Sequence, residues 1–114
     1  MKLAVVGSRE FSDYNLLEEH IMKNYPTVTT IVSGGAKGAD TYAELYAKKF
    51  GLHTEIEKPN WNLYGKSAGA IRNKAIVESS DMILAFWDGE SKGTKITIDM
   101  AIKSGKPYQI VMYK

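Results

Sequence analysis

The sequence predicts an α/β protein, a three-layer sandwich in which helices cover both faces of a five-stranded, mainly parallel sheet. Apolar runs of strand length alternate along the 114 residues with helical patterns, and strands separated by helices pair in parallel. The runs at residues 3–6 and 82–86 are almost continuously apolar, which is typical of central strands buried on both faces. The run at residues 52–57 alternates with polar residues and suits an edge. Together these observations predict the strand order 3-2-1-4-5.

The elements follow one another in the order that such a sheet requires. Short apolar runs indicate the strands, and apolar residues three and four positions apart indicate the helices. The expected elements are strand 2–6, helix 13–24, strand 28–32, helix 39–50, strand 52–57, loop 58–66, helix 67–79, strand 81–86, a helix from about residue 94, and strand 107–113.

Capping residues mark several of the helix ends. Asp13 or Ser12 is expected to cap the first helix, because a short polar side chain there can accept a backbone N–H. Gly51 is expected to end the second helix and Gly105 the last one. These signals fix the helix boundaries on which the loop assignments depend.

Composition limits the classes of function. One domain spanning residues 1–114 is expected, because this length supports one core. The chain has no cysteine and two histidines far apart, so neither a metal site nor a cysteine nucleophile is expected, and a cytoplasmic location fits. No apolar run approaches the roughly 20 residues that span a membrane. The formal charge of +2 is a weak bias, so nucleic acid is not expected as a partner.

Three glycine-bearing loops follow the first, second and fourth strands, at residues 7–9, 33–38 and 87–94. In a parallel sheet these loops meet at one edge, and ligands bind there, where the strand order reverses. Glycines let the backbone approach a ligand closely, and helix N-termini offer N–H groups to anions. Serine and threonine hydroxyls and an arginine add further donors. The loops therefore predict a site for an anionic group such as phosphate.

The residues expected to bind the ligand lie in these loops or on the helices beside them. They are Gly7, Ser8, Arg9, Ser33, Gly34, Gly35, Lys37, Gly38, Asp40, Arg72, Asn73, Trp87, Asp88, Ser91, Gly93 and Thr94. The glycine spacing G-G-x-x-G is neither the G-x-G-x-x-G of dinucleotide-binding folds nor a Walker P-loop, which disfavours a nicotinamide dehydrogenase and a P-loop NTPase. No cofactor is expected.

Four linked motifs carry a family resemblance. The first motif, GSR, follows the first strand, and the second, SGGAKGAD, follows the second strand. The third, WNLYGKSAGAIRN, precedes the fourth strand, and the last, AFWDGESKGT, spans the end of the fourth strand and the loop after it. In this order they resemble the YspA/YpsA-related branch of the SLOG superfamily, which also includes the LOG-type phosphoribohydrolases and the DprA/Smf proteins. The resemblance covers nearly the whole chain. It implies a Rossmann-like fold and a site for a nucleotide or a nucleotide-derived sugar such as an ADP-ribose.

The comparison with the LOG-type enzymes bears on catalysis. Arg72 matches their arginine before the fourth strand, and Gly93-Thr94 matches part of their P-G-G-x-G-T-x-x-E motif, but Thr97 stands where they have glutamate. A carboxylate in such a site stabilises charge or activates water as the N-glycosidic bond breaks. The candidates to replace it are Asp88 and Glu90, and in principle Asp40 or Glu44.

Several of these residues have a structural reading beside the functional one. Arg72 is either a surface arginine or a phosphate clamp, and Asn73 either a ligand contact or a local hydrogen-bonding residue. Asp40 has three possible roles: its carboxylate interacts favourably with the dipole of its helix, it accepts a hydrogen bond from a ribose hydroxyl, or it fixes its loop by accepting from backbone N–H groups. Trp61 and Tyr64 either cover the core or form a stacking wall for a base or sugar.

Two functions follow. The first is a binder of a nucleotide or nucleotide-derived sugar that acts without catalysis, as a sensor, carrier or sequestering protein. The second is a LOG-like nucleosidase or phosphoribohydrolase. Since SLOG relatives often form oligomers, the resemblance also allows a homo-oligomer, for example through the helix face that carries Tyr42 and Tyr46.

Overall fold

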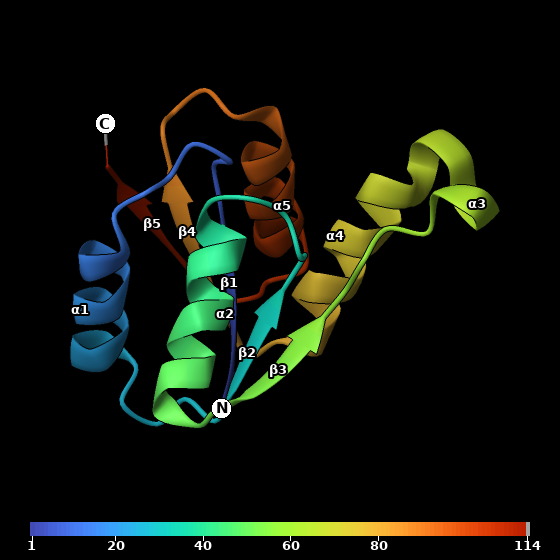
Figure 1. Cartoon of the computed structure of the whole chain (residues 1–114). Coiled ribbons are helices and arrows are strands. Elements are labelled where there is room, and N and C mark those ends of the chain that lie inside the picture. The colour runs from blue at the N-terminus through green and yellow to red at the C-terminus, as the bar shows by residue number, and fades with distance from the viewer. Residues whose placement is uncertain (114) are drawn as a thin grey trace.

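A computed structural model, which describes residues 1–113, contains a five-stranded sheet in the order β3-β2-β1-β4-β5. All four strand pairs are parallel. The α/β fold class and the strand order are therefore confirmed, with β1 and β4 side by side in the middle of the sheet and β3 at one edge (Figure 1).

The observed elements follow the predicted alternation. The strands are β1 (Lys2–Gly7), β2 (Thr30–Ser33), β3 (His53–Ile56), β4 (Met82–Trp87) and β5 (Tyr108–Met112). The helices are α1 (Tyr14–Asn24), α2 (Ala39–Phe50), α3 (Trp61–Tyr64), the 3₁₀ turn η1 (Gly65–Ser67), α4 (Ala68–Ser79) and α5 (Lys92–Lys103). No helix among residues 1–113 is long and apolar enough to cross a bilayer.

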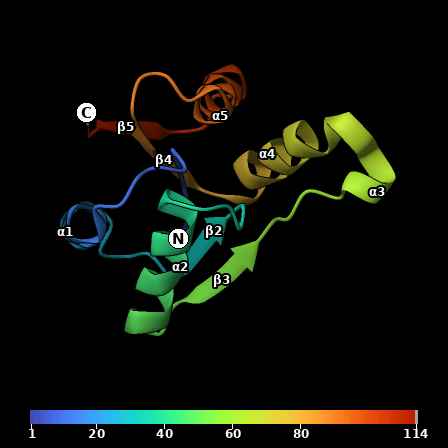
Figure 2. The same ribbon diagram turned by 45° about the horizontal axis from the view of Figure 1, so that its top comes forward.

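Helices cover both faces of the sheet and bury one cluster of apolar side chains on each (Figures 1 and 2). On one face α1 and α2 enclose Leu17, Ile21 and Ala43. On the other, α4 and α5 enclose Ile76 and Ile98. Because each sheet face is apolar, the strands at the centre are buried on both sides.

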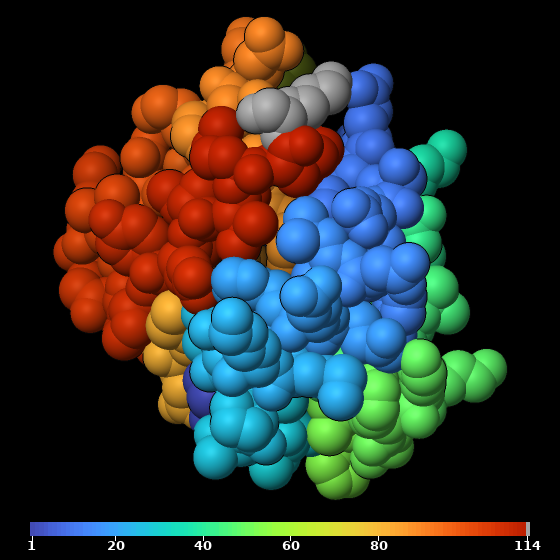
Figure 3. All heavy atoms as spheres, turned by 90° about the vertical axis from the view of Figure 1, so that its left-hand side faces the viewer, coloured from blue at the N-terminus to red at the C-terminus, as the bar shows by residue number. Residues whose placement is uncertain are grey.

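The first helix and the last strand lie side by side on one face of the molecule (Figure 3). Tyr25 directly follows α1, and its hydroxyl donates a hydrogen bond to Gln109 on β5. Phe11 packs against Tyr113 with ring centroids 4.9 Å apart. Through these contacts the segment around α1 covers the face of the sheet at β4 and β5.

Three differences from the sequence prediction exceed a shift of one residue. The second strand starts at Thr30 rather than residue 28, because Val28 belongs to the turn that closes on Tyr25. The expected loop 58–66 contains α3, whose first turn is capped by Asn60 accepting from the Leu63 N–H at 3.1 Å. The last helix begins at Lys92, two residues early.

The helix face named as an oligomer interface is not available for that role. Tyr46 is buried in the core, and Tyr42 packs against the same cluster. The edge-to-face contact of Tyr42 with Phe11, at 6.2 Å between ring centroids, belongs to this packing. The interface expectation for this face was wrong, and the expectation that both tyrosines fit the core face of their helix is confirmed, because they complete the layer between α1 and α2.

Candidate functional site

A cleft of about 570 Å³ lies beyond the carboxyl ends of β1 and β4, at the point where the strand order reverses. This is the position at which open parallel sheets bind ligands. Its walls come from the loops after β1 and β4, from the first turns of α2 and α5, and from one side of α4. The lining residues are Val6, Gly7, Ser8, Arg9, Glu10, Ala36, Asp40, Arg72, Asn73, Ile76, Asp88, Glu90, Ser91, Lys92, Gly93, Thr94 and Thr97.

The structure brings together ten of the residues expected to bind a ligand and leaves six outside the cleft lining. The ten are Gly7, Ser8, Arg9, Asp40, Arg72, Asn73, Asp88, Ser91, Gly93 and Thr94. The six are Ser33, Gly34, Gly35, Lys37, Gly38 and Trp87. Most of the six belong to the loop after β2, which contributes only Ala36 and, through its helix, Asp40 to the cleft wall. Ligand binding by the ten remains a prediction.

Helical spacing could have found two of the lining residues that sequence reasoning missed. Ile76 lies four positions after Arg72 on α4, and Thr97 four positions after Gly93 on α5. Residues four apart share a helix face. The other missed residues, Val6, Glu10, Ala36 and Lys92, adjoin predicted site residues in the sequence.

Two of the three glycines of the loop after β2, Gly34 and Gly38, lie close against other parts of the protein, whereas Gly35 is exposed. A Cβ on Gly38 would lie 2.3 Å from the Ser8 carbonyl oxygen and 2.6 Å from that of Arg9, and the φ of Gly38 is +79°. A Cβ on Gly34 would lie 2.7 Å from Arg72 Nη1 and 2.9 Å from Asp40 Oδ2. These two glycines therefore let the loop after β2 pack against the loop after β1 and against α4.

Asp40 fixes this loop from the first turn of α2. Its Oδ2 atom accepts hydrogen bonds from the N–H groups of Gly34, at 3.0 Å, and Ala36, at 3.2 Å. Its other oxygen, Oδ1, accepts none from residues 1–113, although Asp40 lines the cleft. Burial raises the pKa of this carboxyl, and the Ala36 N–H and the nearby Arg72 charge oppose that rise.

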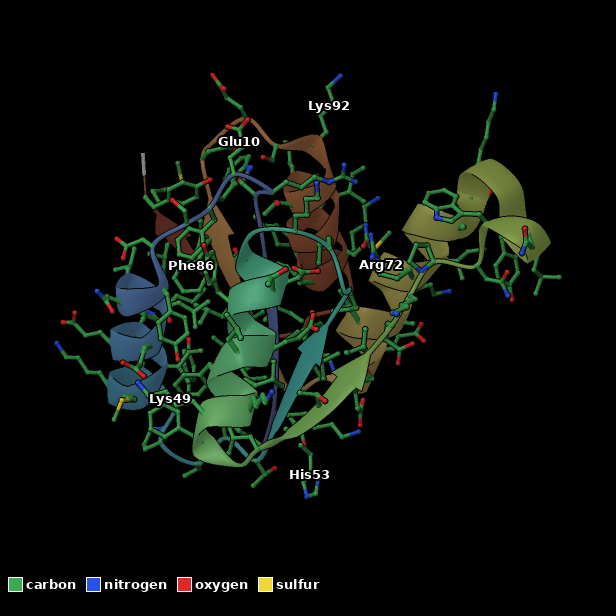
Figure 4. The ribbon with its side chains drawn as sticks, viewed as in Figure 1. Glu10, Lys49, His53, Arg72, Phe86 and Lys92 are labelled. Carbon is green, nitrogen blue, oxygen red and sulfur yellow. The ribbon has the colours of Figure 1, made fainter. Side chains whose placement is uncertain are left out.

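Arg72 reaches from α4 to the end of β2 (Figure 4). Its Nη1 donates to the Gly34 carbonyl at 2.8 Å, and its Nε donates to Asn73 Oδ1 at 2.8 Å. The guanidinium therefore joins α4 to the loop after β2 and lies at the cleft wall. Its head is half-buried and bound to protein, unlike that of a solvated surface arginine.

The loop after β4 is organised by Asp88. Asp88 Oδ1 accepts from the N–H groups of Glu90, at 2.9 Å, and Ser91, at 2.8 Å. These bonds lower the pKa of the Asp88 carboxyl to about 2. The Ser91 hydroxyl lies 3.1 Å from Asp88 Oδ2 and 2.9 Å from the Ser8 hydroxyl. Since a carboxylate only accepts, the chain of hydroxyls donates toward Asp88.

The first turn of α5 opens into the cleft. Lys92, Gly93 and Thr94 all line it, and the first N–H groups of a helix have no partner within the helix. Apart from its two chain neighbours and the backbone of its own helix, no atom of residues 1–113 lies within 4 Å of the position that a Cβ on Gly93 would take. Thr97, one turn further on, is buried and donates its hydroxyl to the Gly93 carbonyl at 3.2 Å.

Charges of both signs line the cleft. The cations are Arg9, Arg72 and Lys92, and the carboxylates are Glu10, Asp40, Asp88 and Glu90. Glu10 and Lys92 stand at the outer rim (Figure 4). Backbone N–H groups hold both aspartates, whereas the two glutamates are exposed. The cleft can therefore offer donors and acceptors to the same ligand.

The aromatic residues singled out in the sequence lie outside the cleft lining. Trp61 and Tyr64 are on α3 and exposed, so they do not cover the core. The Trp87 indole N–H donates to the Ser91 carbonyl at 3.1 Å, which places this ring under the loop after β4. None of the three is among the lining residues of the cleft.

The strand order and the position of the cleft define an α/β protein of the Rossmann-like class. The profile of the YspA, cpYpsA-related SLOG family matches residues 1–64. The Gene 61 protein of Mycobacterium phage D29 is 32% identical over 116 residues, which covers 93% of this chain and 92% of that protein. The chain therefore belongs to the YspA, cpYpsA-related SLOG family.

Solved structures support the same fold. DNA processing protein A (DprA) from Streptococcus pneumoniae matches 99% of this chain with a TM-score of 0.81 at 22% identity, and this chain spans 50% of its length. DprA from Helicobacter pylori matches all of this chain with a TM-score of 0.74 at 22% identity, and this chain spans 66% of it. The protein TM1055 matches 94% of this chain with a TM-score of 0.68 at 18% identity. At these identities the likeness is one of fold.

The expectation that nucleic acid is not a partner is contradicted by these comparisons. The H. pylori protein, which shares the fold, binds single-stranded DNA. The formal charge of +2 was a poor guide, because net charge sums the whole molecule while nucleic acid contacts one local surface.

Proposed function

We propose that the cleft binds a nucleotide or a nucleotide-derived sugar of the ADP-ribose kind, without cleaving it. The observation that carries this proposal is that one cleft is lined both by the first turn of α5 and by Asp40, whose Oδ1 accepts no hydrogen bond from residues 1–113. A simple anion would need only donors. A phosphorylated ribose needs donors for its phosphate and acceptors for its hydroxyls, and the mixed lining supplies both.

The phosphate is assigned to the first turn of α5. The N–H groups around Gly93 and Thr94 and the positive end of the helix dipole favour an anion there. Arg9 and Lys92 add cations at the cleft wall. Gly93 leaves open space in front of this turn, so a phosphate can approach the backbone.

The ribose is assigned to the side of the cleft near α4. Asp40 Oδ1 is available to accept a hydroxyl, since Oδ2 takes both backbone N–H groups. Asn73 accepts from Arg72 through Oδ1, which leaves its amide hydrogens as donors. A hydroxyl pair placed between Asp40 and Asn73 would find an acceptor and a donor.

Binding without cleavage follows from how the carboxylates are used. N-glycosidic hydrolysis needs a carboxylate that can stabilise charge or activate water. Asp88 Oδ1 and Asp40 Oδ2 are held by backbone N–H groups, and Asp40 Oδ1 is assigned to a ribose hydroxyl. Thr97 presents a hydroxyl that donates to the Gly93 carbonyl. In this proposal the protein acts as a sensor, carrier or sequestering protein.

A LOG-like nucleosidase is the alternative, and Glu90 is the observation that favours it. Its side chain is exposed at the cleft and makes no hydrogen bond to residues 1–113, while its backbone N–H donates to Asp88. A swing of this loop toward a bound ribose would supply the missing carboxylate.

A single-stranded polynucleotide is the second candidate occupant, because each nucleotide of a polymer presents the same phosphate and sugar. DprA from H. pylori binds single-stranded DNA. An oligothymidylate therefore belongs in any screen of the cleft beside the small nucleotides.

The test is a thermal-shift screen with product analysis. AMP, ADP-ribose, NAD, cyclic ADP-ribose, the nucleoside monophosphates and dT₂₀ are each added, and the recovered compound is analysed by chromatography. A ligand that binds only the folded state raises Tm. A raised Tm with one of the small nucleotides, recovered intact, supports the binder. If free base or ribose phosphate is released, and this release is lost in the Glu90→Gln variant, the protein is the nucleosidase rather than the binder. No shift with any compound contradicts both.

A further inference from the structure

The connection between β3 and α4 projects from the body of the protein as an arm, defined here as residues 58–67. It contains α3 and η1 and stands away from the sheet in both views (Figures 1 and 2). Residues 60–67 are all exposed. The arm leaves the sheet at the carboxyl end of β3, the same edge of the sheet at which the cleft lies.

The arm and α4 as far as Val77 carry charge of one sign, and Glu78 in the last turn of α4 is the first carboxylate after the arm. Residues 58–77 contain four cations, Lys58, Lys66, Arg72 and Lys74, and no aspartate or glutamate. The rest of the chain holds the other 11 cations and all 13 carboxylates. The surface is therefore locally basic on a molecule that is otherwise slightly acidic.

Large apolar side chains on the arm face solvent. Trp61 is 59% exposed, Leu63 67% and Tyr64 45%. The Trp61 ring carbon Cη2 lies 3.8 Å from the position of a Cβ on Gly69, so one edge of the indole rests beside the first turn of α4. The rest of the ring remains open, although burying it would remove a large apolar area from water.

We propose that the arm binds single-stranded nucleic acid, with bases stacked on Trp61 and Tyr64 and phosphates held by Lys58 and Lys66. Proteins that bind single strands without sequence preference combine aromatic platforms with cations that follow the backbone. The arm has both features, and the absence of carboxylates over residues 58–77 removes the repulsion that a polyanion would meet elsewhere on the chain.

A second copy of this chain is a poorer occupant for the same surface. A two-fold interface places the same patch on both sides, so it would bring two sets of like charges together without a carboxylate between them. A polyanion neutralises these charges instead. The charge pattern therefore favours nucleic acid over self-association.

The arm is continuous with the side of the cleft that Arg72 lines. Lys58 carbon atoms lie 3.7 Å from the position of a Cβ on Gly35, and Arg72 contacts the neighbouring Gly34. A strand lying on the arm would thus pass the loop after β2 on its way to the cleft. The proposal for the arm does not depend on which ligand the cleft takes.

The test measures binding of fluorescein-labelled dT₂₀ by fluorescence anisotropy. Trp61→Ala is expected to weaken binding about fivefold or more, since the loss of one stacked base corresponds to at least that change in affinity. Tyr64→Ala should weaken it in the same direction. Tyr108→Ala is the matched control, because Tyr108 is 43% exposed on β5, away from the arm, and it should leave the affinity unchanged within about twofold.

Charge and stacking are separated by two further measurements. Lys66→Gln should lower the affinity and the salt dependence, whereas Lys103→Gln, exposed at the end of α5, should change neither. In a Trp87→Phe background Trp61 is the remaining tryptophan, and dT₂₀ should quench its fluorescence while AMP does not.

Three results would overturn the proposal. The first is no binding of dT₂₀ by the wild-type chain. The second is binding that Gly93→Ala in the cleft abolishes and Trp61→Ala leaves intact, which would assign the polymer to the cleft. The third is concentration-dependent self-association in size-exclusion chromatography that Trp61→Ala removes, which would make the arm a contact between copies.

Discussion

Gly38 and Gly93 stand at the starts of two helices that meet at the same cleft, and they are glycines for opposite reasons. Gly38 has a φ of +79°, and the space for its side chain is filled by the Ser8 and Arg9 carbonyls. Gly93 has no positive φ, and apart from its chain neighbours and its own helix backbone no atom of residues 1–113 lies within 4 Å of the position of its Cβ. The loop after β2 is therefore packed shut against its neighbours, whereas the start of α5 is open.

The difference teaches that a glycine-rich loop in this fold need not be the part that holds the ligand. The loop after β2 contains three glycines, yet Ala36 is its lining residue in the cleft. Its glycines position Asp40 and Arg72, whose side chains do face the cleft. The predictions below test the two loops, from the largest expected effect to the smallest.

Gly38→Ala should cause the largest loss of stability. Alanine disfavours a positive φ by about 1–2 kcal/mol, and its Cβ would overlap two backbone oxygens of the loop after β1. Backbone shifts to relieve such overlap cost about 1–3 kcal/mol more. Urea denaturation should therefore show a free energy of unfolding lower by about 3 kcal/mol. A decrease of less than about 1 kcal/mol in the free energy of unfolding would mean that close packing of the loop after β2 contributes little to stability.

Arg72→Ala should have the next largest effect on stability. It removes the donors to the Gly34 carbonyl and to Asn73 Oδ1, and an acceptor left unpaired costs about 1–3 kcal/mol. Lys74→Ala on the same helix is the control. Lys74 is exposed and 3.8 Å from Glu78, so its loss should change the free energy of unfolding by at most about 0.5 kcal/mol. Equal effects of the two substitutions would show that the Arg72 hydrogen bonds do not stabilise the loop after β2.

Asp88→Asn should change how stability depends on pH. The pKa of Asp88 is about 2 in the folded protein, against an ordinary value of 3.8. A carboxyl with a lowered folded pKa stabilises the fold above its unfolded pKa and loses that contribution as pH falls through the folded value. The gap in stability between wild type and Asp88→Asn should therefore be full at pH 5 and narrow toward pH 2.

Chemical denaturation of both proteins across this pH range checks the expectation, and the other carboxyls cancel in the difference. A gap that stays constant from pH 5 to pH 2 would show that the backbone N–H groups of Glu90 and Ser91 do not hold the ionised form of Asp88. The loop after β4 would then owe its shape to other contacts.

Gly93→Ala should have the smallest effect on stability, and in the opposite direction. Alanine is favoured over glycine in a helix by about 1 kcal/mol or less, and its Cβ meets open space. The free energy of unfolding should stay the same or rise slightly. A marked loss would show that the start of α5 is as tightly packed as the loop after β2.

Much of the fold could be predicted from the sequence, because strand burial and helical period are local patterns. The continuous apolar runs of β1 and β4 placed both strands at the centre, and the polar run of β3 placed it at the edge. Asp13 was predicted as a cap, and it accepts from the Leu16 N–H at 3.0 Å. Each of these features depends on neighbours along the chain.

The contacts between loops could not be predicted in this way. Gly38 reads in the sequence as a ligand-facing glycine, but its role comes from Ser8, 30 positions earlier in the chain. Arg72 and Gly34 are joined over a similar separation. Trp61 and Tyr64 were expected near the core or the ligand, and only the path of α3 shows that they project into solvent.

The most direct test of the central claim compares two glycines in equivalent positions. Gly93 and Gly69 are the second residues of α5 and α4, and neither has a positive φ. Gly93 lines the cleft and Gly69 does not. Both are replaced by alanine, and the rise in Tm with AMP, ADP-ribose and NAD is measured against wild type. The account predicts that Gly93→Ala loses the rise while Gly69→Ala keeps it. An unchanged rise in Gly93→Ala would contradict ligand binding at the start of α5.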